Sequence, residues 1–298
     1  MEGEFAVKAN SSSGVVYEGG IAGRTSVSYS VSIKNYTNKT ELNGTIIGGM
    51  VGEIQNSGDN KQIILENCLN LAKLTTTSYV GGLVGNMNAT QATIRNCANG
   101  GELTGTGNYA AGGLVTHTTT TAVTCENSLY LKTDKVTKGL GDQADSAGVI
   151  TLDTAKVTNG TFSTPIADFL SAIAPAALTV SGNAKLDGTS LTYTEAGEQA
   201  IIFYWNSTEL YRKTVTVTAK DMLTVSGTYT YNGREQTVDY EVKDGSKTLT
   251  VGKDYTVSGN TKKNAGTHTV TITGQGNYTG EVSRDWRVAP AGLTITAE

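Results

Sequence analysis

Apolar and polar residues alternate in four short stretches of the first 130 residues, and every stretch ends in an asparagine. These asparagines are Asn35, Asn67, Asn96 and Asn127. The residues two and four positions before each of them are apolar, and the residue directly before is charged. This period of two predicts a strand with one buried face. The asparagine shares the parity of the apolar residues, so we expect it to be buried.

A glycine motif precedes each stretch and recurs with the same period. Its second glycines are Gly20, Gly49, Gly82 and Gly113. Two markers that recur together every 29 to 33 residues predict a repeat protein whose units bury a core only by stacking. Equivalent residues of stacked strands lie about 4.8 Å apart, so we expect the four asparagines to form a structural ladder of amides. No helical period follows the glycines, which favours tight turns over a phosphate-binding loop.

Two further columns support this register. The residues before the asparagines alternate in charge: Lys34, Glu66, Arg95 and Glu126. Stacking would place opposite charges side by side. A second column contains three asparagines, Asn38, Asn70 and Asn99, and has Tyr130 at the equivalent position of the fourth unit. The break predicts that the array ends there.

The repeat resembles a known family. Residues 79–85 (YVGGLVG) and 94–100 (IRNCANG) are similar to the GLUG repeat of bacterial surface proteins. The resemblance covers about residues 15–130, and the fourth unit departs from it at Thr116. It implies a right-handed parallel β-helix exposed outside the cell, and it implies no activity.

A second resemblance covers about residues 221–290. Residues 231–233 (YNG), 252–257 (GKDYTV), 264–267 (NAGT) and 276–280 (GNYTG) carry it. They resemble the MBG-type, immunoglobulin-like β module found in tandem on bacterial surface proteins. The expected fold is all-β: a right-handed parallel β-helix, or solenoid, of about four coils, followed by two small immunoglobulin-like β-sandwich modules.

The expected domains are 1–176 for the solenoid with its cap, 177–220 with part of 152–176 for a small β-sandwich, 221–290 for the MBG-type module and 291–298 for the start of another module. One helix is expected at 165–174. Thr164 before Pro165 is a favourable helix start, Pro175 ends the segment, and its apolar residues share one face. We expect this helix to close the end of the solenoid.

Composition excludes several functions. The net charge is −4 and the basic residues are dispersed, which argues against nucleic-acid binding. No run of 18 or more apolar residues predicts a membrane span. The chain starts without a secretion signal and ends without a wall-sorting motif, so we interpret it as a fragment of a longer surface protein.

Catalysis is not predicted. The two histidines, His117 and His268, fall in different expected domains, and we expect His117 to be solvated in a Thr-rich turn. No metal-ligand spacing is present, so we expect neither a metal nor a cofactor. Glu66 and Glu126 would lie about 9–10 Å apart, at the upper end of an inverting glycosidase pair. The charge ladder accounts for them better.

Three cysteines are present. Cys68 and Cys97 hold equivalent places in adjacent units, whereas Cys125 lies in the apolar column. A Cys68–Cys97 disulfide is one interpretation, because stacked neighbours fall within bonding range by Cα distance. Their Cβ atoms, about 4.8 Å apart, are too distant for good geometry. We therefore favour buried free thiols.

The function we expect is that of an extracellular structural or adhesive protein of a bacterial cell surface, not an enzyme. The solenoid would display a binding face, and the sandwich modules would form a stalk. The expected partner is a glycan or protein ligand of a host or community. The expected contacts are in loops between the glycine motif and the asparagine strand: Glu53, Gln55, Asp59, Lys61, Asn86, Asn88 and Gln91. The alternative is a polysaccharide-active lyase or glycosidase, by analogy of fold alone.

Overall fold

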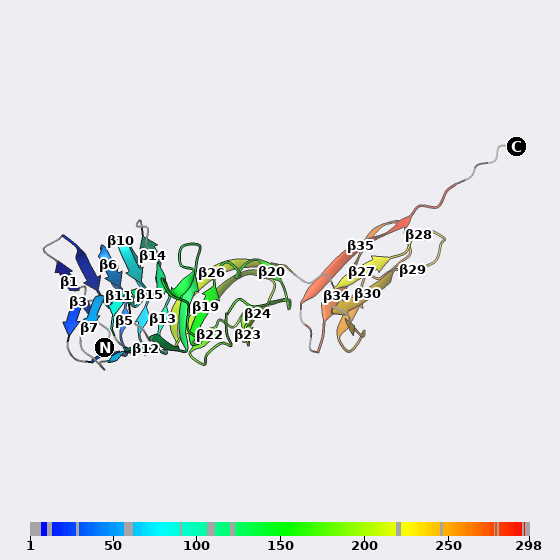
Figure 1. Ribbon diagram of the computed structural model, residues 1–298. Coiled ribbons are helices and arrows are strands. Elements are labelled where there is room, and N and C mark those ends of the chain that lie inside the picture. Colours follow the sequence, from blue (N-terminus) through cyan, green and yellow to red (C-terminus); the bar gives the residue numbers. More distant parts are fainter. Residues whose placement is uncertain are drawn as a thin grey trace. The chain divides into compact units, whose positions relative to one another are not determined.

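The computed structural model describes residues 7–10, 14–27, 30–56, 62–89, 91–105, 111–119, 123–218, 222–244, 247–276, 278, 280–293 and 295. Strands dominate these ranges, and no helix occurs in them (Figure 1). The chain divides into two compact units, Met1–Ala219 and Lys220–Glu298. The expected all-β fold is thus confirmed.

The first sheet of the solenoid has two arms. One arm contains β2 (Val16–Gly19), β6 (Leu42–Gly48) and β10 (Leu74–Gly81). The other contains β3 (Ala22–Val27), β7 (Val51–Asn56) and β11 (Val84–Asn88). Strand β15 (Gly112–Thr118) pairs in parallel with both β10 and β11. Three shorter strands extend the first arm or β15: β1 (Val7–Asn10), β14 (Leu103–Gly105) and β18 (Lys138–Leu140).

Two more parallel sheets complete each coil. The second contains β4 (Val31–Lys34), β8 (Gln62–Glu66), β12 (Gln91–Arg95) and β16 (Val123–Glu126). The third contains β5 (Thr37–Asn38), β9 (Leu69–Asn70), β13 (Ala98–Asn99), β17 (Ser128–Lys132) and β19 (Val149–Asp153). Because four strands stack in the second sheet, three full turns separate its first strand from its last. This arrangement confirms the predicted solenoid of stacked parallel strands (Figure 1).

The asparagines at the strand ends occupy one column, but their predicted burial is wrong. Asn35, Asn67 and Asn127 are exposed, and Asn96 is half-buried. All four have left-handed backbones, with φ between 45° and 54°. Asparagine adopts this conformation more readily than most residues. Each strand, with its alternation of buried and exposed side chains, therefore ends one residue earlier than expected, because the chain turns at the asparagine.

The buried amide ladder is formed by the second asparagine column. Asn38, Asn70 and Asn99 are at most 1% exposed. Asn38 Nδ2 donates to Asn70 Oδ1 at 2.8 Å, and Asn70 Nδ2 donates to Asn99 Oδ1 at 2.7 Å. Asn70 Nδ2 also donates to the carbonyl of Ala72 at 3.1 Å. The ladder ends at Tyr130, as expected, but β18 and β19 continue the stack beyond it.

The second glycine of each motif makes room for this ladder. A Cβ atom on Gly82 would lie 2.1 Å from the carbonyl oxygen of Gly113 and 2.5 Å from Asn99 Cγ. A Cβ atom on Gly113 would lie 2.2 Å from the ring of Tyr130. Contacts this short would force the backbone to move. The glycines are thus needed for the close approach of coils, in agreement with the interpretation made from the sequence.

The three cysteines are buried free thiols, as expected. Cys68 and Cys97 are stacked, and the backbone N–H of Cys68 donates to Cys97 Sγ at 3.4 Å. Burial raises the pKa of the Cys125 thiol to about 11. At neutral pH Cys125 is therefore a protonated, apolar side chain of the core.

Residues 154–218 form two small sheets. One contains β20 (Gly160–Thr161), β26 (Thr208–Thr218), β25 (Gly197–Trp205) and β22 (Leu178–Val180). The other contains β21 (Pro165–Ile166), β24 (Ser190–Tyr193) and β23 (Ala184–Asp187). We call these residues the middle module.

The prediction of a helix at 165–174 is wrong. Pro165 and Ile166 pair with β24 instead, and Leu170 forms a bridge with Leu152 at the end of the solenoid. Asp168 has a left-handed backbone with φ of 53°, which ends any helical run. The buried Phe169 and Leu170 satisfy the apolar pattern through turns. Tertiary pairing thus overrides a favourable helix start.

The middle module packs on the outer face of the third sheet. Leu69, Ala98 and Leu129 of that sheet belong to the same apolar cluster as Phe203 and Trp205 of β25. The middle module and the outer face of the third sheet therefore share one apolar core.

The unit Lys220–Glu298 has its own core. One sheet contains β27 (Leu223–Ser226), β30 (Asp239–Asp244) and β31 (Lys247–Thr248). Another contains β28 (Tyr229–Thr230), β35 (Glu281–Ala289), β34 (Gly266–Gly274) and β32 (Tyr255–Ser258). The short strands β29 (Gln236–Thr237) and β33 (Thr261–Lys262) form a separate pair. Leu223 and Val242 of the first sheet share an apolar cluster with Val270 and Trp286 of the second.

Replacing Asn70 by Leu tests the buried ladder. The substitution removes the acceptor of Asn38 and the donor to Asn99, so we expect the free energy of unfolding to fall by about 2 kcal/mol or more. The control is Asn67→Gly, which keeps the left-handed corner and loses an exposed hydrogen bond, at a cost of no more than about 1 kcal/mol. Chemical unfolding followed by circular dichroism measures both. Equal losses would contradict the assignment of the ladder.

Replacing Gly82 by Ala tests the close approach of coils. Because the added methyl group would collide with a backbone carbonyl, we expect a loss of about 1–3 kcal/mol or more, as for overpacked cores. Gly182→Ala is the matched control, since no atom lies within 4 Å of its added Cβ, and it should change stability by less than about 0.5 kcal/mol. Thermal unfolding of the two variants compares them. An unchanged melting temperature of Gly82→Ala would show that the coils are not packed this tightly.

Candidate functional site

A row of polar side chains crosses the first sheet, with one residue from each of four adjacent strands. These residues are Arg24 of β3, Glu53 of β7, Asn86 of β11 and His117 of β15. Each follows the last position of a glycine motif, so the repeat itself places them. The strand register aligns each with its neighbour in the row. We call these four residues the polar row.

The centre of the polar row is a buried carboxylate. The Glu53 side chain is only 5% exposed, and its Oε2 lies 2.6 Å from Arg24 Nε. Its Oε1 accepts a hydrogen bond from Asn86 Nδ2 at 2.8 Å. Arg24 offsets the charge at Oε2, which accepts no hydrogen bond of its own from the described residues, and Asn86 bonds Oε1; a buried carboxylate needs such a partner to stay ionised. Glu53 therefore holds Arg24, whose side chain is 36% exposed, at the surface.

The far end of the polar row is a histidine–aspartate pair. His117 Nδ1 lies 2.6 Å from Asp142 Oδ2, and both side chains are 35% exposed. Asp142 Oδ1 also accepts the backbone N–H of Thr118 at 3.2 Å, which fixes the carboxylate. A carboxylate at Nδ1 orients the imidazole and directs Nε2 away from Asp142.

Two tyrosines on the other arm of the sheet face the ends of the polar row. Tyr17 of β2 and Tyr79 of β10 both align with Ile46 of β6. The guanidinium carbon of Arg24 lies 5.1 Å from the centre of the Tyr17 ring. The ring centres of Tyr79 and His117 are 5.4 Å apart. Each end of the polar row thus combines an aromatic ring with an ionisable group.

The structure changes the setting of the contact residues expected from the sequence. Glu53, Gln55, Asn86 and Asn88 lie on strands β7 and β11, and Gln91 begins β12, so they are not loop residues. The strands continue further past the glycine motif than the alternation pattern indicated. Glu53 and Asn86 are brought together in the polar row, and Gln55 aligns with Asn88 beside it. Asp59 and Lys61 lie outside the described residues.

Sequence reasoning missed the role of His117. We expected a solvated residue in a turn, but His117 lies on β15 and pairs with Asp142. One signal was available, because His117 occupies the same motif position as Glu53 and Asn86. Asp142 carried no signal, since it lies after the last repeat.

The charged column of the second sheet confirms its predicted role. Glu66 lies 2.8 Å from Lys34 Nζ and 3.0 Å from Arg95 Nε. Hydrogen bonds from Arg95 and then Lys34 lower the pKa of Glu66 to about 2. Arg95 aligns with both Glu66 and Glu126. Glu66 therefore belongs to a charge ladder, in which Arg95 stands between it and Glu126.

The described residues contain neither a metal-binding cluster nor a membrane-spanning helix. No three His, Cys, Asp or Glu side chains in these ranges come close enough together to hold a metal ion. None of the described segments is a helix long and apolar enough to cross a membrane.

Comparison with known proteins supplies no assignment. No family model matches the chain, and no curated protein matches its sequence.

The lowered pKa of Glu66 predicts how stability depends on pH. The pKa of the Glu66 carboxyl group is about 2 in the folded chain, against an ordinary value of 4.5. Its contribution is therefore present above pH 4.5 and is lost as the pH falls toward 2. We expect Glu66→Gln to lower the melting temperature at pH 7 and to have little effect at pH 2. The control is Glu41→Gln, which changes an exposed carboxylate outside the column. An effect of Glu66→Gln that is equal at both pH values would contradict the ladder.

Proposed function

We propose that the chain is part of an extracellular structural or adhesive protein of a bacterial cell surface. In this proposal the solenoid displays a binding face, and the Lys220–Glu298 unit is an immunoglobulin-like spacer of the MBG type. The observation that carries the proposal is the polar row, which places one side chain per coil on adjacent parallel strands. Stacked repeats commonly bind partners through such extended faces.

The contacts within the row favour recognition. Glu53 is occupied by Arg24 and Asn86, and is nearly inaccessible. The accessible groups are therefore the guanidinium of Arg24 at one end and the His117–Asp142 pair at the other. Charged donors and acceptors of this kind, next to tyrosine rings, suit a polar ligand with hydroxyl or amide groups. The proposed partner is a glycan or protein of a host or community.

A polysaccharide-active enzyme is the second candidate. The specific observation in its favour is the His117–Asp142 pair, because a carboxylate at Nδ1 is the usual arrangement for a histidine that transfers protons. Glu53, the carboxylate of the polar row, is bound by Arg24 and Asn86, so it is not available as a second acid or base beside this pair. The recognition proposal is therefore preferred.

Truncation tests where binding resides. We expect residues 1–219 to bind cell-surface extracts and arrayed glycans with an affinity within about twofold of the full chain, because the polar row lies in that unit. His117→Gln should weaken binding by about tenfold, as expected when a hydrogen bond to a charged group is lost. The control is Lys185→Gln, which changes an exposed residue of the middle module. Loss of binding on truncation would place the site in the C-terminal unit.

A degradation assay separates the two candidates. The full chain is incubated with a panel of polysaccharides, and new reducing ends and unsaturated products are measured. We expect no cleavage. Cleavage that disappears in His117→Gln would favour the enzyme and contradict the adhesive proposal.

A further inference from the structure

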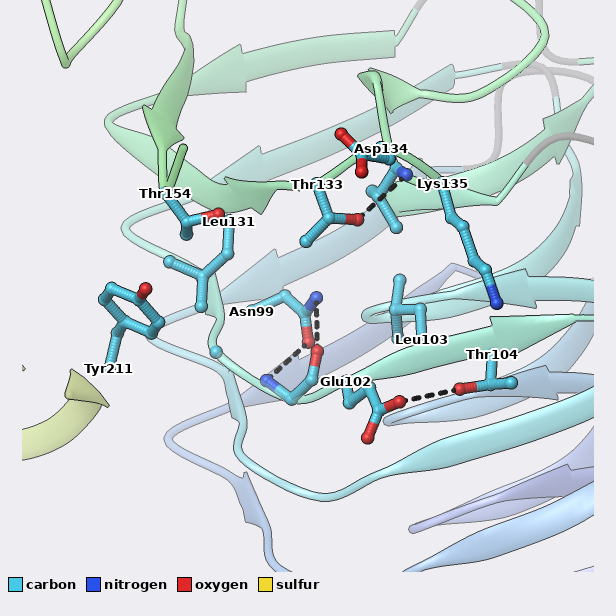
Figure 2. Close-up of a pocket in the computed structure, with 13 residues that line it drawn as sticks. Asn99, Glu102, Leu103, Thr104, Leu131, Thr133, Asp134, Lys135, Thr154 and Tyr211 are labelled. Carbon is cyan, nitrogen blue, oxygen red and sulfur yellow. Dashed lines mark hydrogen bonds between the residues drawn. The ribbon is translucent and has the colours of Figure 1, made fainter. Parts of the chain in front are cut away.

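A cleft of about 420 Å³ lies where the solenoid meets the middle module. It is lined by the corner at residues 99–104, by Leu131 and the turn at 133–136, and by Thr154 and Tyr211 of the middle module. Figure 2 shows Tyr211 and Thr154 on one side, with the turn opposite the corner. The volume is within the range of small-molecule sites, which often form between domains. The cleft is separate from the polar row, because none of the row's residues lines it.

The inner surface of the cleft is apolar and has one aromatic ring. Leu103, Leu131 and Val136 are at most 8% exposed and form part of the lining. The ring of Tyr211 stacks on Phe203, with centres 6.0 Å apart, so it is held in place by the core of the middle module. A ligand in this cleft therefore meets a fixed apolar wall.

The outer surface of the cleft is charged. Glu102, Asp134 and Lys135 are exposed residues of the lining. The Glu102 carboxylate accepts from Thr104 Oγ1 at 3.1 Å and lies 3.0 Å from Lys73 Nζ. These contacts orient the carboxylate at the cleft. Two acidic groups and one lysine provide acceptors and a donor, and they do not favour a strongly anionic ligand.

The corner beneath the ligand space is rigid. Asn99 Oδ1 accepts the backbone N–H of Gly101 at 3.2 Å, and Asn99 Nδ2 donates to the carbonyl of Gly101. A Cβ atom on Gly100 would lie 2.3 Å from the carbonyl oxygen of Leu210, so the corner and the middle module are in close contact. The end of the buried ladder thereby fixes the cleft. A preformed site loses little entropy when it binds.

We propose that this cleft binds a short, uncharged saccharide, with a sugar ring against Tyr211 and its hydroxyl groups bonded to Glu102, Asp134 and Lys135. A sugar ring has apolar C–H faces and a rim of hydroxyl groups, so it matches an aromatic wall beside charged acceptors and donors. A purely apolar ligand would leave the charged groups unused, and a polyanion would find no excess of positive charge, because Lys73 and Lys135 only balance Glu102 and Asp134. This inference rests on the proposed function, because it names a ligand class and a second site for the same adhesive unit.

The test is a titration of the isotope-labelled full chain with di- to tetrasaccharides of glucose, mannose, galactose, xylose and N-acetylglucosamine. We expect at least one saccharide to shift the backbone NMR signals of Gly100, Gly101 and residues 133–136. Tyr211→Leu, which keeps an apolar contact but removes the ring, should weaken binding at least tenfold. Tyr211→Phe should bind within about threefold of the unchanged chain. Lys135→Ala should also weaken binding, whereas Lys138→Ala, an exposed lysine outside the cleft, should not.

Several results would overturn the inference. They are the absence of any shift with the whole panel, shifts confined to the polar row, and equal binding by Tyr211→Leu and Tyr211→Phe. Binding to cell-surface extracts, measured in parallel, separates this inference from the proposed function. Extract binding without saccharide shifts in the cleft removes only the inference. Saccharide binding in the cleft without binding to extracts would support the saccharide site and contradict only the adhesive proposal.

Discussion

The structure of the first unit depends on the contact between a glycine column and a buried amide ladder. Asn38, Asn70 and Asn99 bond to one another through the stack. The second glycines of the first three coils, Gly20, Gly49 and Gly82, lie against this ladder without space for a methyl group. An unpaired amide in such an interior would cost about 1–3 kcal/mol, so the ladder fixes the register of every coil. All three sheets, and the polar row on the first of them, follow from that register.

The ends of the ladder explain how the solenoid joins the middle module. Tyr130 takes the place of a fourth asparagine, and its hydroxyl donates to the carbonyl of Thr137 at 3.0 Å. The chain then continues through β18 and β19, and the outer face of the third sheet is covered by β25 and β26. One apolar core therefore spans the junction, and the cleft of Figure 2 lies at its edge. The two proposed binding regions thus belong to one unit.

Much of the fold could be predicted because a repeat multiplies weak signals. The glycine motif, the charge alternation and the break at Tyr130 each recur or fail at fixed positions, and the structure confirms the solenoid they predict. The wrong predictions concern backbone conformation and long-range pairing, which the pattern of apolar and polar residues does not show. The alternation of apolar and polar residues cannot show that the chain turns at Asn35 and its equivalents. An asparagine with a left-handed backbone fits the alternation as well as a strand residue does. The segment at 165–174 has a favourable helix start, but pairing with β24 and with Leu152 decides its structure. Asp142 and Tyr211 are distant in sequence from their site partners, so only the fold brings them there.

Hydrogen exchange of asparagine side-chain amides, followed by NMR, tests the buried ladder most directly. We expect slow exchange of the side-chain amide protons of Asn38, Asn70 and Asn99, which are buried and bonded. We expect fast exchange for Asn35, Asn67 and Asn127, which lie at exposed corners. Fast exchange at Asn70 and Asn99, or protection at the exposed corners instead, would contradict the buried ladder.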